Sequence, residues 1–312
     1  MRNLTVQNNA GDGAKAGQAL AVYADASRVL MENVNLYGNQ DTLFTAPLPL
    51  QEREQNGFRG PRENTPRLDT VQYYKNCTIR GNIDFIFGGA NAVFDTCRLE
   101  PWHHISGTCY ITAPSTPAGK PGYLFVNCTV HGNTGGNGGG IALYGASGKE
   151  SKMTLVSCTV TGNTSLFVGG GVEFTPYTTM NVYNTVVSGN TAANGGDDLV
   201  GTNTALAATA NLPAVLSYAV NGSVVYGAGK AVVAGSSFDP ATMLGPLAGN
   251  GGPTQTCLLL GADNPARTLG MPYVDLSALG QDFDPQIGPE ITGFDQTGLS
   301  REGTSAMGAC VK

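Results

Sequence analysis

The amino-acid sequence predicts an all-β solenoid in which short parallel strands stack into a β-helix. A motif that recurs along the chain, a high glycine content and a low content of charged residues predict this fold. Glycine occupies 44 of the 312 positions, and charged residues make up only 13% of them. Such a composition is typical of a chain with many tight turns and few long amphipathic helices.

The recurring motif is a short apolar or β-branched stretch that ends in Gly-Asn. It reads VNLYGN from Val34, CTIRGN from Cys77, CTVHGN from Cys128, CTVTGN from Cys158 and TVVSGN from Thr185. The intervals fit rungs of roughly 20 to 30 residues with insertions, which bury an apolar face only when they stack. We expect a parallel β-helix over residues 1–195 and a looser β-helix region over 196–312 that closes the coil.

Stacking aligns equivalent side chains of successive rungs. Cys77, Cys128 and Cys158 are predicted to form an inward ladder that serves packing, because free cysteine behaves as a small apolar residue. The motif asparagines are predicted to be structural, because Asn tolerates left-handed turns and bonds its own backbone; they are Asn39, Asn82, Asn133, Asn163 and Asn190. The seven cysteines show neither CxxC nor Cys/His metal spacing, so no metal or cofactor is expected.

Charge and hydropathy exclude several classes of protein. The formal net charge is −6 and the pI is about 5.0, without clustered Lys and Arg, so nucleic acid is not an expected partner. No apolar run approaches the roughly 18 to 20 residues of a spanning helix, so membrane insertion is not expected. Export would need a leader outside the printed sequence.

Two aspartates occupy the same position in successive copies of the motif. Asp41 follows Asn39 by two residues and Asp84 follows Asn82 by two, whereas the later copies carry Gly135, Ser165 and Ala192 there. The turn itself therefore does not require an acid. Two readings stay open, a pair of solvated turn aspartates or a catalytic pair, and the apolar residues that follow each aspartate favour the second. Stacked carboxylates repel and titrate as a coupled pair.

At these residues the sequence resembles pectin methylesterases, the aspartyl esterases of pectin. The resemblance covers residues 1 to about 130 and rests on GNQDTLF and DFIFG on successive repeats, and on YITAPSTPAGKPGYLFVNC. It implies a right-handed parallel β-helix of the pectin-lyase-like class that hydrolyses the methyl esters of homogalacturonan. We expect a secreted or surface-displayed bacterial enzyme, monomeric and without cofactor. With three histidines and no GxSxG, a serine-hydrolase triad is not expected.

The resemblance also implies roles for individual residues. Asp84 corresponds to the nucleophile and Asp41 to the general acid and then base. Gln18 and Gln40 correspond to glutamines that stabilise the anionic tetrahedral intermediate, and Phe85 to an aromatic that lines a sugar subsite. These residue types suit the chemistry, because a carboxylate can form an acyl-enzyme anhydride, a protonated carboxyl can donate to the leaving alcohol, and amide N–H groups can hold an oxyanion.

Two further features concern the predicted substrate groove. Residues 45–70 interrupt the rung between the two aspartates with four prolines, and we expect this insertion to form a groove wall rather than a plain surface loop. Trp102, the single tryptophan, is a candidate for sugar contact, with a core or rim position as the alternative.

The chain departs from that family in three places. It begins mid-coil, so its first rung is expected to be an exposed edge. The motif Leu-Gly-Arg-Pro-Trp is absent, and alignment puts Gly145 where the family has the arginine that holds its nucleophile ionised. Lys149 and Lys152 are candidate replacement cations, as are Arg59, Arg62 and Arg67 of the insertion.

Residues 125–312 instead resemble bacterial surface and adhesin-like β-helix repeats, which implies surface display. A non-catalytic β-helical protein that binds polysaccharide is therefore the alternative to the esterase. A polysaccharide lyase or polygalacturonase is less favoured, because the sequence shows no acidic cluster suited to calcium.

Overall fold

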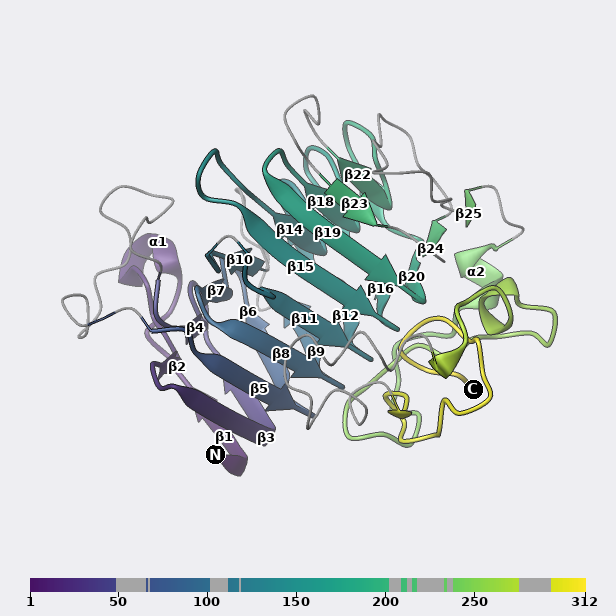
Figure 1. Ribbon diagram of the computed structural model, residues 1–312, viewed down its shortest axis with the longest axis horizontal. Coiled ribbons are helices and arrows are strands. Elements are labelled where there is room, and N and C mark those ends of the chain that lie inside the picture. The colour runs from purple at the N-terminus through teal and green to yellow at the C-terminus, as the bar shows by residue number, and fades with distance from the viewer. Residues whose placement is uncertain are drawn as a thin grey trace.

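The computed structural model is an all-β protein whose core is a parallel β-helix (Figure 1). It describes residues 1–48, 66, 68–101, 112–117, 119–201, 209–211, 215–217, 233–234, 238–274 and 293–312. Each rung contributes strands to three strips of parallel strands, which we call the first, second and third strips. The fold predicted from the repeats is confirmed.

The first and second strips form one 15-stranded sheet, because the long strand β3 (Arg28–Tyr37) runs through both. After β3, the first strip contains β5 (Val71–Lys75), β8 (Asn91–Asp95), β11 (Tyr123–Val126), β15 (Ser151–Val156), β19 (Thr178–Tyr183) and β23 (Thr209–Asn211). The second contains β6 (Thr78–Gly81), β9 (Arg98–Pro101), β12 (Thr129–His131), β16 (Thr159–Thr161), β20 (Thr185–Val187), β24 (Val215–Ser217) and β25 (Val233–Ala234).

The third strip contains β2 (Val22–Ala24), β4 (Leu43–Thr45), β7 (Ile86–Gly88) and β10 (Thr112–Pro114), and then β14 (Ile141–Leu143), β18 (Val172–Phe174) and β22 (Leu199–Gly201). A small sheet in the turns joins β13 (Thr134–Gly135), β17 (Thr164–Ser165) and β21 (Thr191–Ala192). The helices are the short α1 (Gly13–Ala16), α2 (Pro240–Met243) and the 3-10 helix η1 (Pro265–Arg267). Among the described residues, no helix could cross a membrane.

Stacked side chains fill the interior of the coil. The rings of Tyr74, Phe94 and Phe125 lie parallel on successive rungs, with centroids 4.9 and 4.6 Å apart. The predicted cysteine ladder is confirmed as part of the buried core, and Cys97 joins Cys77, Cys128 and Cys158 in it. Burial raises the pKa of the Cys97 and Cys128 thiols well above its usual value, so these thiols are unreactive.

Two ladders of asparagines hold the turns. The predicted one is confirmed: Asn133 Nδ2 donates to Asn163 Oδ1 (2.8 Å), and Asn163 Nδ2 donates to Asn190 Oδ1 (2.9 Å). A second ladder, which we did not predict, occupies the single left-handed residue between the first and second strips. There Asn76 (φ 54°) donates to Asn33 (φ 54°) over 3.0 Å.

The C-terminal part of the chain is the region expected to close the β-helix more loosely. The coil continues through β22 to β25, beyond residue 195. Residues 238–274 and 293–312, which we call the C-terminal segment, fold back beside the second strip (Figure 1). Thr254 Oγ1 donates to the carbonyl of Thr96 (2.9 Å), and the Ala309 amide donates to Thr159 Oγ1 (2.9 Å). Besides the short helices α2 and η1, the described part of this segment forms isolated antiparallel bridges, and its hydrogen bonds to the coil hold it in place.

β1 (Arg2–Gln7) is largely exposed and pairs with β3 in the described structure.

Candidate active site

Asp41 and Asp84 lie at the same turn position on adjacent rungs, as the repeat predicts. Asp41 lies between β3 and β4, and Asp84 between β6 and β7. The Asp41 amide donates to the carbonyl of Ile83 (2.9 Å), and Leu43 pairs with Ile86 where the strands begin. The backbone therefore holds both side chains in register across neighbouring rungs.

The turns that carry the aspartates differ from the later turns of the same motif. In the later rungs the left-handed residue is the glycine of Gly-Asn, for example Gly132 (φ 74°) and Gly162 (φ 66°). In the first two rungs it is Asp41 (φ 63°) and Asp84 (φ 45°). Asp accepts this conformation better than most residues, but at some cost, and such strain is common at functional sites.

The turns that carry Asp41 and Asp84 also require the glycine of Gly-Asn, here because there is no room for a side chain. A Cβ added at Gly81 would lie 2.2 Å from Phe85 Cβ and 2.5 Å from Thr42 Oγ1. Thr42 Oγ1 itself donates to the carbonyl of Arg80 (3.0 Å) on the next rung. The Gly-Asn motif thus supports two different turns, and one of them presents a carboxylate.

The Asp41 carboxyl group is strongly perturbed. Its side chain is buried, with the residue only 3% exposed. Burial, followed by the negative charge of Asp84, raises the pKa of Asp41 to about 7, while a hydrogen bond from Gln18 opposes the shift. Near neutral pH Asp41 can therefore both donate and accept a proton, as a general acid and base must.

The two predicted glutamines have different surroundings, and only Gln18 is placed at the aspartate pair. Gln18 lies two residues after the end of α1, is exposed and hydrogen-bonds Asp41. Gln40 precedes Asp41, and its side chain lies against the start of α1, since a Cβ at Gly13 would be 2.3 Å from Gln40 Oε1. Gln18 is thus placed where its amide can reach a group bound at Asp41.

The assignment of Phe85 to a sugar subsite is not supported by its position. Phe85 is 1% exposed and packs in the core of the coil. β7 begins at Ile86, so Phe85 belongs to the turn, and the alternation of faces starts one residue later than the motif suggests. Phe87 occupies the outer face instead and stacks on Phe44 of the preceding rung, with ring centroids 4.6 Å apart.

An aromatic column thus flanks the aspartates on the outer face of the third strip. Tyr23 meets Phe44 edge to face at 5.0 Å, and Phe87 continues the column. Ala46 and Leu48, at the start of the predicted insertion, pack against it. The motif DFIFG contains both Phe85 and Phe87. Which of the two faces outward depends on the first residue of the strand, and the motif alone does not show where the strand begins.

Several predicted groups lie outside the described residues: Trp102, most of the insertion, and Arg59, Arg62 and Arg67. Lys152 is described and lies on β15 of the first strip. Among the described residues there is no group of three or more His, Cys, Asp or Glu side chains that could hold a metal ion.

Replacement of Asp41 by Asn should stabilise the protein at alkaline pH. The folded-state pKa of Asp41 lies above the unfolded value of 3.8, so its stabilising contribution is complete below about pH 4 and is lost as pH rises through 7. Asn does not ionise, so Asp41→Asn should gain roughly 2 to 4 kcal/mol relative to wild type between pH 4 and 8. Urea unfolding at both pH values measures this gain. An equal difference at the two pH values would contradict the raised pKa.

Comparison with known proteins gives a consistent family over part of the chain. The pectinesterase family profile matches residues 67–140. A pectinesterase of Ralstonia nicotianae is 32% identical over 169 residues, which cover 52% of this chain and 38% of the relative. Pectinesterase B of Dickeya dadantii is 34% identical over 154 residues (46% and 32%), and pectinesterase 31 of Arabidopsis thaliana is 32% identical over 133 residues (42% and 33%). The chain spans 38% or less of the length of these three relatives.

Proposed function

We propose that the pectinesterase-like part of this chain hydrolyses the methyl esters of polygalacturonate to pectate and methanol. The observation that carries the proposal is the pair Asp41 and Asp84, held at one turn position on adjacent rungs, with the pKa of Asp41 raised to about 7. The similarity to named pectinesterases supports the choice of substrate. Such a substrate places the protein outside the cell, secreted or displayed on its surface.

The reaction uses one carboxylate as nucleophile and one as proton carrier. Asp84, ionised, attacks the ester carbonyl carbon and forms a tetrahedral oxyanion. When the C–O bond to the methoxy group breaks, protonated Asp41 gives its proton to that oxygen, and methanol leaves an acyl-enzyme anhydride at Asp84. Asp41, now a carboxylate, takes one proton from a water molecule, whose oxygen attacks the galacturonyl carbon of the anhydride. The Asp84 carboxylate leaves, and the new galacturonic acid gives its remaining proton to solvent.

Gln18 is proposed as a donor to the oxyanion. Gln18→Ala should lower kcat/KM by the equivalent of about 2 to 4 kcal/mol, because a preorganised donor acts mainly on the transition state. Steady-state methanol release measures this loss. Gln7→Ala, at an exposed position on β1, is the matched control and should be neutral. Unchanged turnover in Gln18→Ala would assign Gln18 to packing.

A non-catalytic polysaccharide-binding protein is the second candidate, and the position aligned with the family arginine favours it. A Cβ at Gly145 would lie 2.2 Å from the carbonyl oxygen of Tyr177, so a side chain does not fit there without backbone movement. Burial, Asp84 and Gln18 shift the pKa of Asp41, and no cation in the described part of the chain contributes. Gly145 itself therefore supplies no cation to the aspartate pair.

Methanol release from methyl-esterified polygalacturonate, measured against pH beside direct binding of the polymer, decides between these candidates. An esterase should release methanol at a rate that falls as pH rises through about 7, because Asp41 then loses the proton that it gives to the leaving group. Binding without methanol release at any pH would establish the second candidate.

A further inference from the structure

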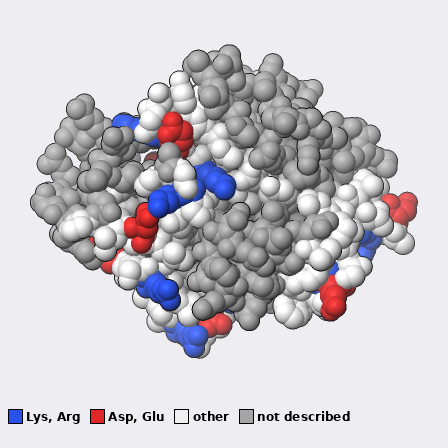
Figure 2. Space-filling model, in the orientation of Figure 1, with Lys and Arg blue, Asp and Glu red and all other residues white. Residues whose placement is uncertain are grey.

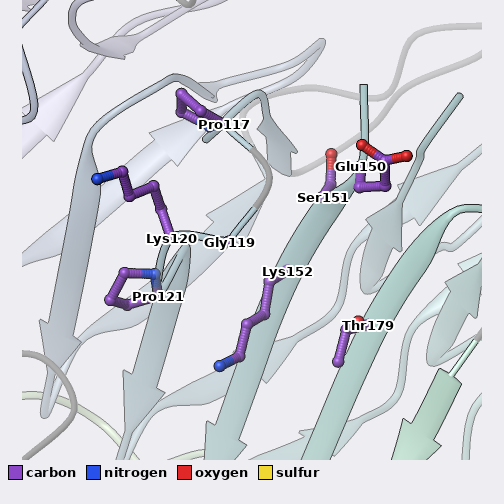
Figure 3. A pocket seen from close by; sticks show the side chains of 8 residues that line it. All are labelled: Pro117, Gly119, Lys120, Pro121, Glu150, Ser151, Lys152 and Thr179. Atoms are coloured by element: carbon purple, nitrogen blue, oxygen red, sulfur yellow. The ribbon is translucent and has the colours of Figure 1, made fainter. Parts of the chain in front are cut away.

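A polar pocket lies on the outer face of the first strip, separate from the aspartate pair. It has a volume of about 430 Å³ and is open to solvent. Its lining comes from the turn before β11 and from the starts of β15 and β19: Pro117, Gly119, Lys120, Pro121, Glu150, Ser151, Lys152 and Thr179. Figure 3 shows Lys152 and Thr179 on one side of this pocket and Glu150 and Ser151 on another.

The floor of the pocket is set by strand register. Lys152 on β15 pairs with Thr179 on β19, so the two side chains lie next to each other on the same outer face. The preceding rung carries Gly122 (φ 78°), where a Cβ would lie 2.1 Å from the Lys152 carbonyl oxygen. Because Gly122 has no side chain, the outer face of the first strip is recessed beside Lys152.

Lys152 and Thr179 are available to a ligand. Among the described residues, the Lys152 ammonium group and the Thr179 hydroxyl have no side-chain or carbonyl partner. Three other cations are paired with carboxylates: Lys120 with Asp69 (2.5 Å), and Arg80 and Arg98 with Glu100. In a chain of net charge −6, the Lys152 ammonium group beside the Thr179 hydroxyl offers an anion two hydrogen-bond donors. Charged side chains are sparse on the face drawn in Figure 2, and most basic ones lie near acidic ones.

The chemistry of the lining favours an acidic sugar. An ammonium group and a hydroxyl on adjacent strands can both donate to one carboxylate. Glu150 adds carboxylate oxygens that accept from sugar hydroxyls, and Pro117 and Pro121 add apolar surface for C–H groups. A methyl ester carries no charge, so the same site would discriminate against it.

We propose that this pocket binds the free carboxylate of a de-esterified galacturonate residue, the product of the reaction proposed above. The identity of the ligand rests on that proposed function. The pocket adjoins the turn after β10, whereas Asp41 and Asp84 precede β4 and β7, at the opposite margin of the third strip. The sugar in the pocket is therefore not the sugar under attack. Holding a product stretch there would retain a partly de-esterified polymer for further hydrolysis.

Calorimetric titration of the Asp84→Asn full chain with fully de-esterified trigalacturonate tests the site without turnover. Lys152→Gln in this background should weaken binding roughly fivefold to tenfold, and Thr179→Val should weaken it by a smaller factor. Binding of the fully methyl-esterified trimer should be unaffected by either change. Lys149→Gln removes the same charge three residues away, outside the pocket lining, and should change affinity less than about twofold.

Equal losses in Lys149→Gln and Lys152→Gln would show only general charge attraction and overturn the proposal. An unchanged affinity in Lys152→Gln, or an equal loss with the methyl-esterified trimer, would overturn it too. Methanol release by the chain with Asp84 intact separates the two claims. If methanol is released but Lys152→Gln does not change product binding, the esterase proposal stands and the pocket proposal is overturned. If Lys152→Gln weakens product binding but no methanol is released, the pocket proposal stands and the esterase proposal is overturned.

Discussion

Asp84→Asn should abolish methanol release, lowering kcat/KM by at least about 10³-fold, because an amide cannot act as the nucleophile. The fold should be retained, since Asn has nearly the same volume and also tolerates the left-handed conformation that Asp84 adopts (φ 45°). Methanol assays on variants with matched thermal unfolding measure the effect. Asp263→Asn, at an exposed position of the C-terminal segment, is the matched control and should keep full activity.

A second readout of Asp84→Asn does not depend on activity. The negative charge of Asp84 helps raise the pKa of Asp41, so its removal should lower the pKa of Asp41 from about 7. Carboxyl-detected NMR titration follows this directly. Retained turnover would point to another nucleophile, and an unchanged pKa of Asp41 would show that the two carboxyl groups do not interact.

Arg301→Ala should destabilise the docking of the C-terminal segment by about 3 to 5 kcal/mol, because it removes a buried cation that donates three hydrogen bonds. Arg301 is 1% exposed. Its guanidinium donates to Asn127 Oδ1 (3.0 Å) and to the carbonyls of Ala306 (3.2 Å) and Gly308 (2.7 Å). Burial lowers its pKa to about 10, so it remains charged at neutral pH while Asp295 opposes the shift.

The loss should appear first as local release of the segment. Hydrogen exchange and limited proteolysis should report opening within residues 293–312 before the coil unfolds, since the segment is held chiefly by side chains of the coil. Arg2→Ala is the control, because its ion pair with Glu32 is largely exposed and should contribute under about 1 kcal/mol. A loss of the same size in both variants would contradict the anchoring role of Arg301.

Much of the fold follows from local pattern. The repeated Gly-Asn motif and the alternation of short strands predict stacked rungs, because a strand of three to six residues buries its apolar side chains only against copies of itself. The same repetition predicts the cysteine and asparagine ladders and the shared position of Asp41 and Asp84. These features depend on residues within one rung and on its exact repetition, both of which can be read along the chain.

The sequence by itself therefore determined the β-helix and the pairing of the two aspartates. The tertiary structure decided the burial of these residues, the pKa of Asp41 and which neighbouring side chains face outward. Whether Phe85 or Phe87 faces outward depends on where β7 begins, and a shift of one residue reverses the face. The pKa of Asp41 depends on burial by neighbouring rungs, and the C-terminal segment lies beside the coil because Asn127 and Thr159 bind it there. Desolvation and such contacts join residues far apart in the chain, so no local pattern records them.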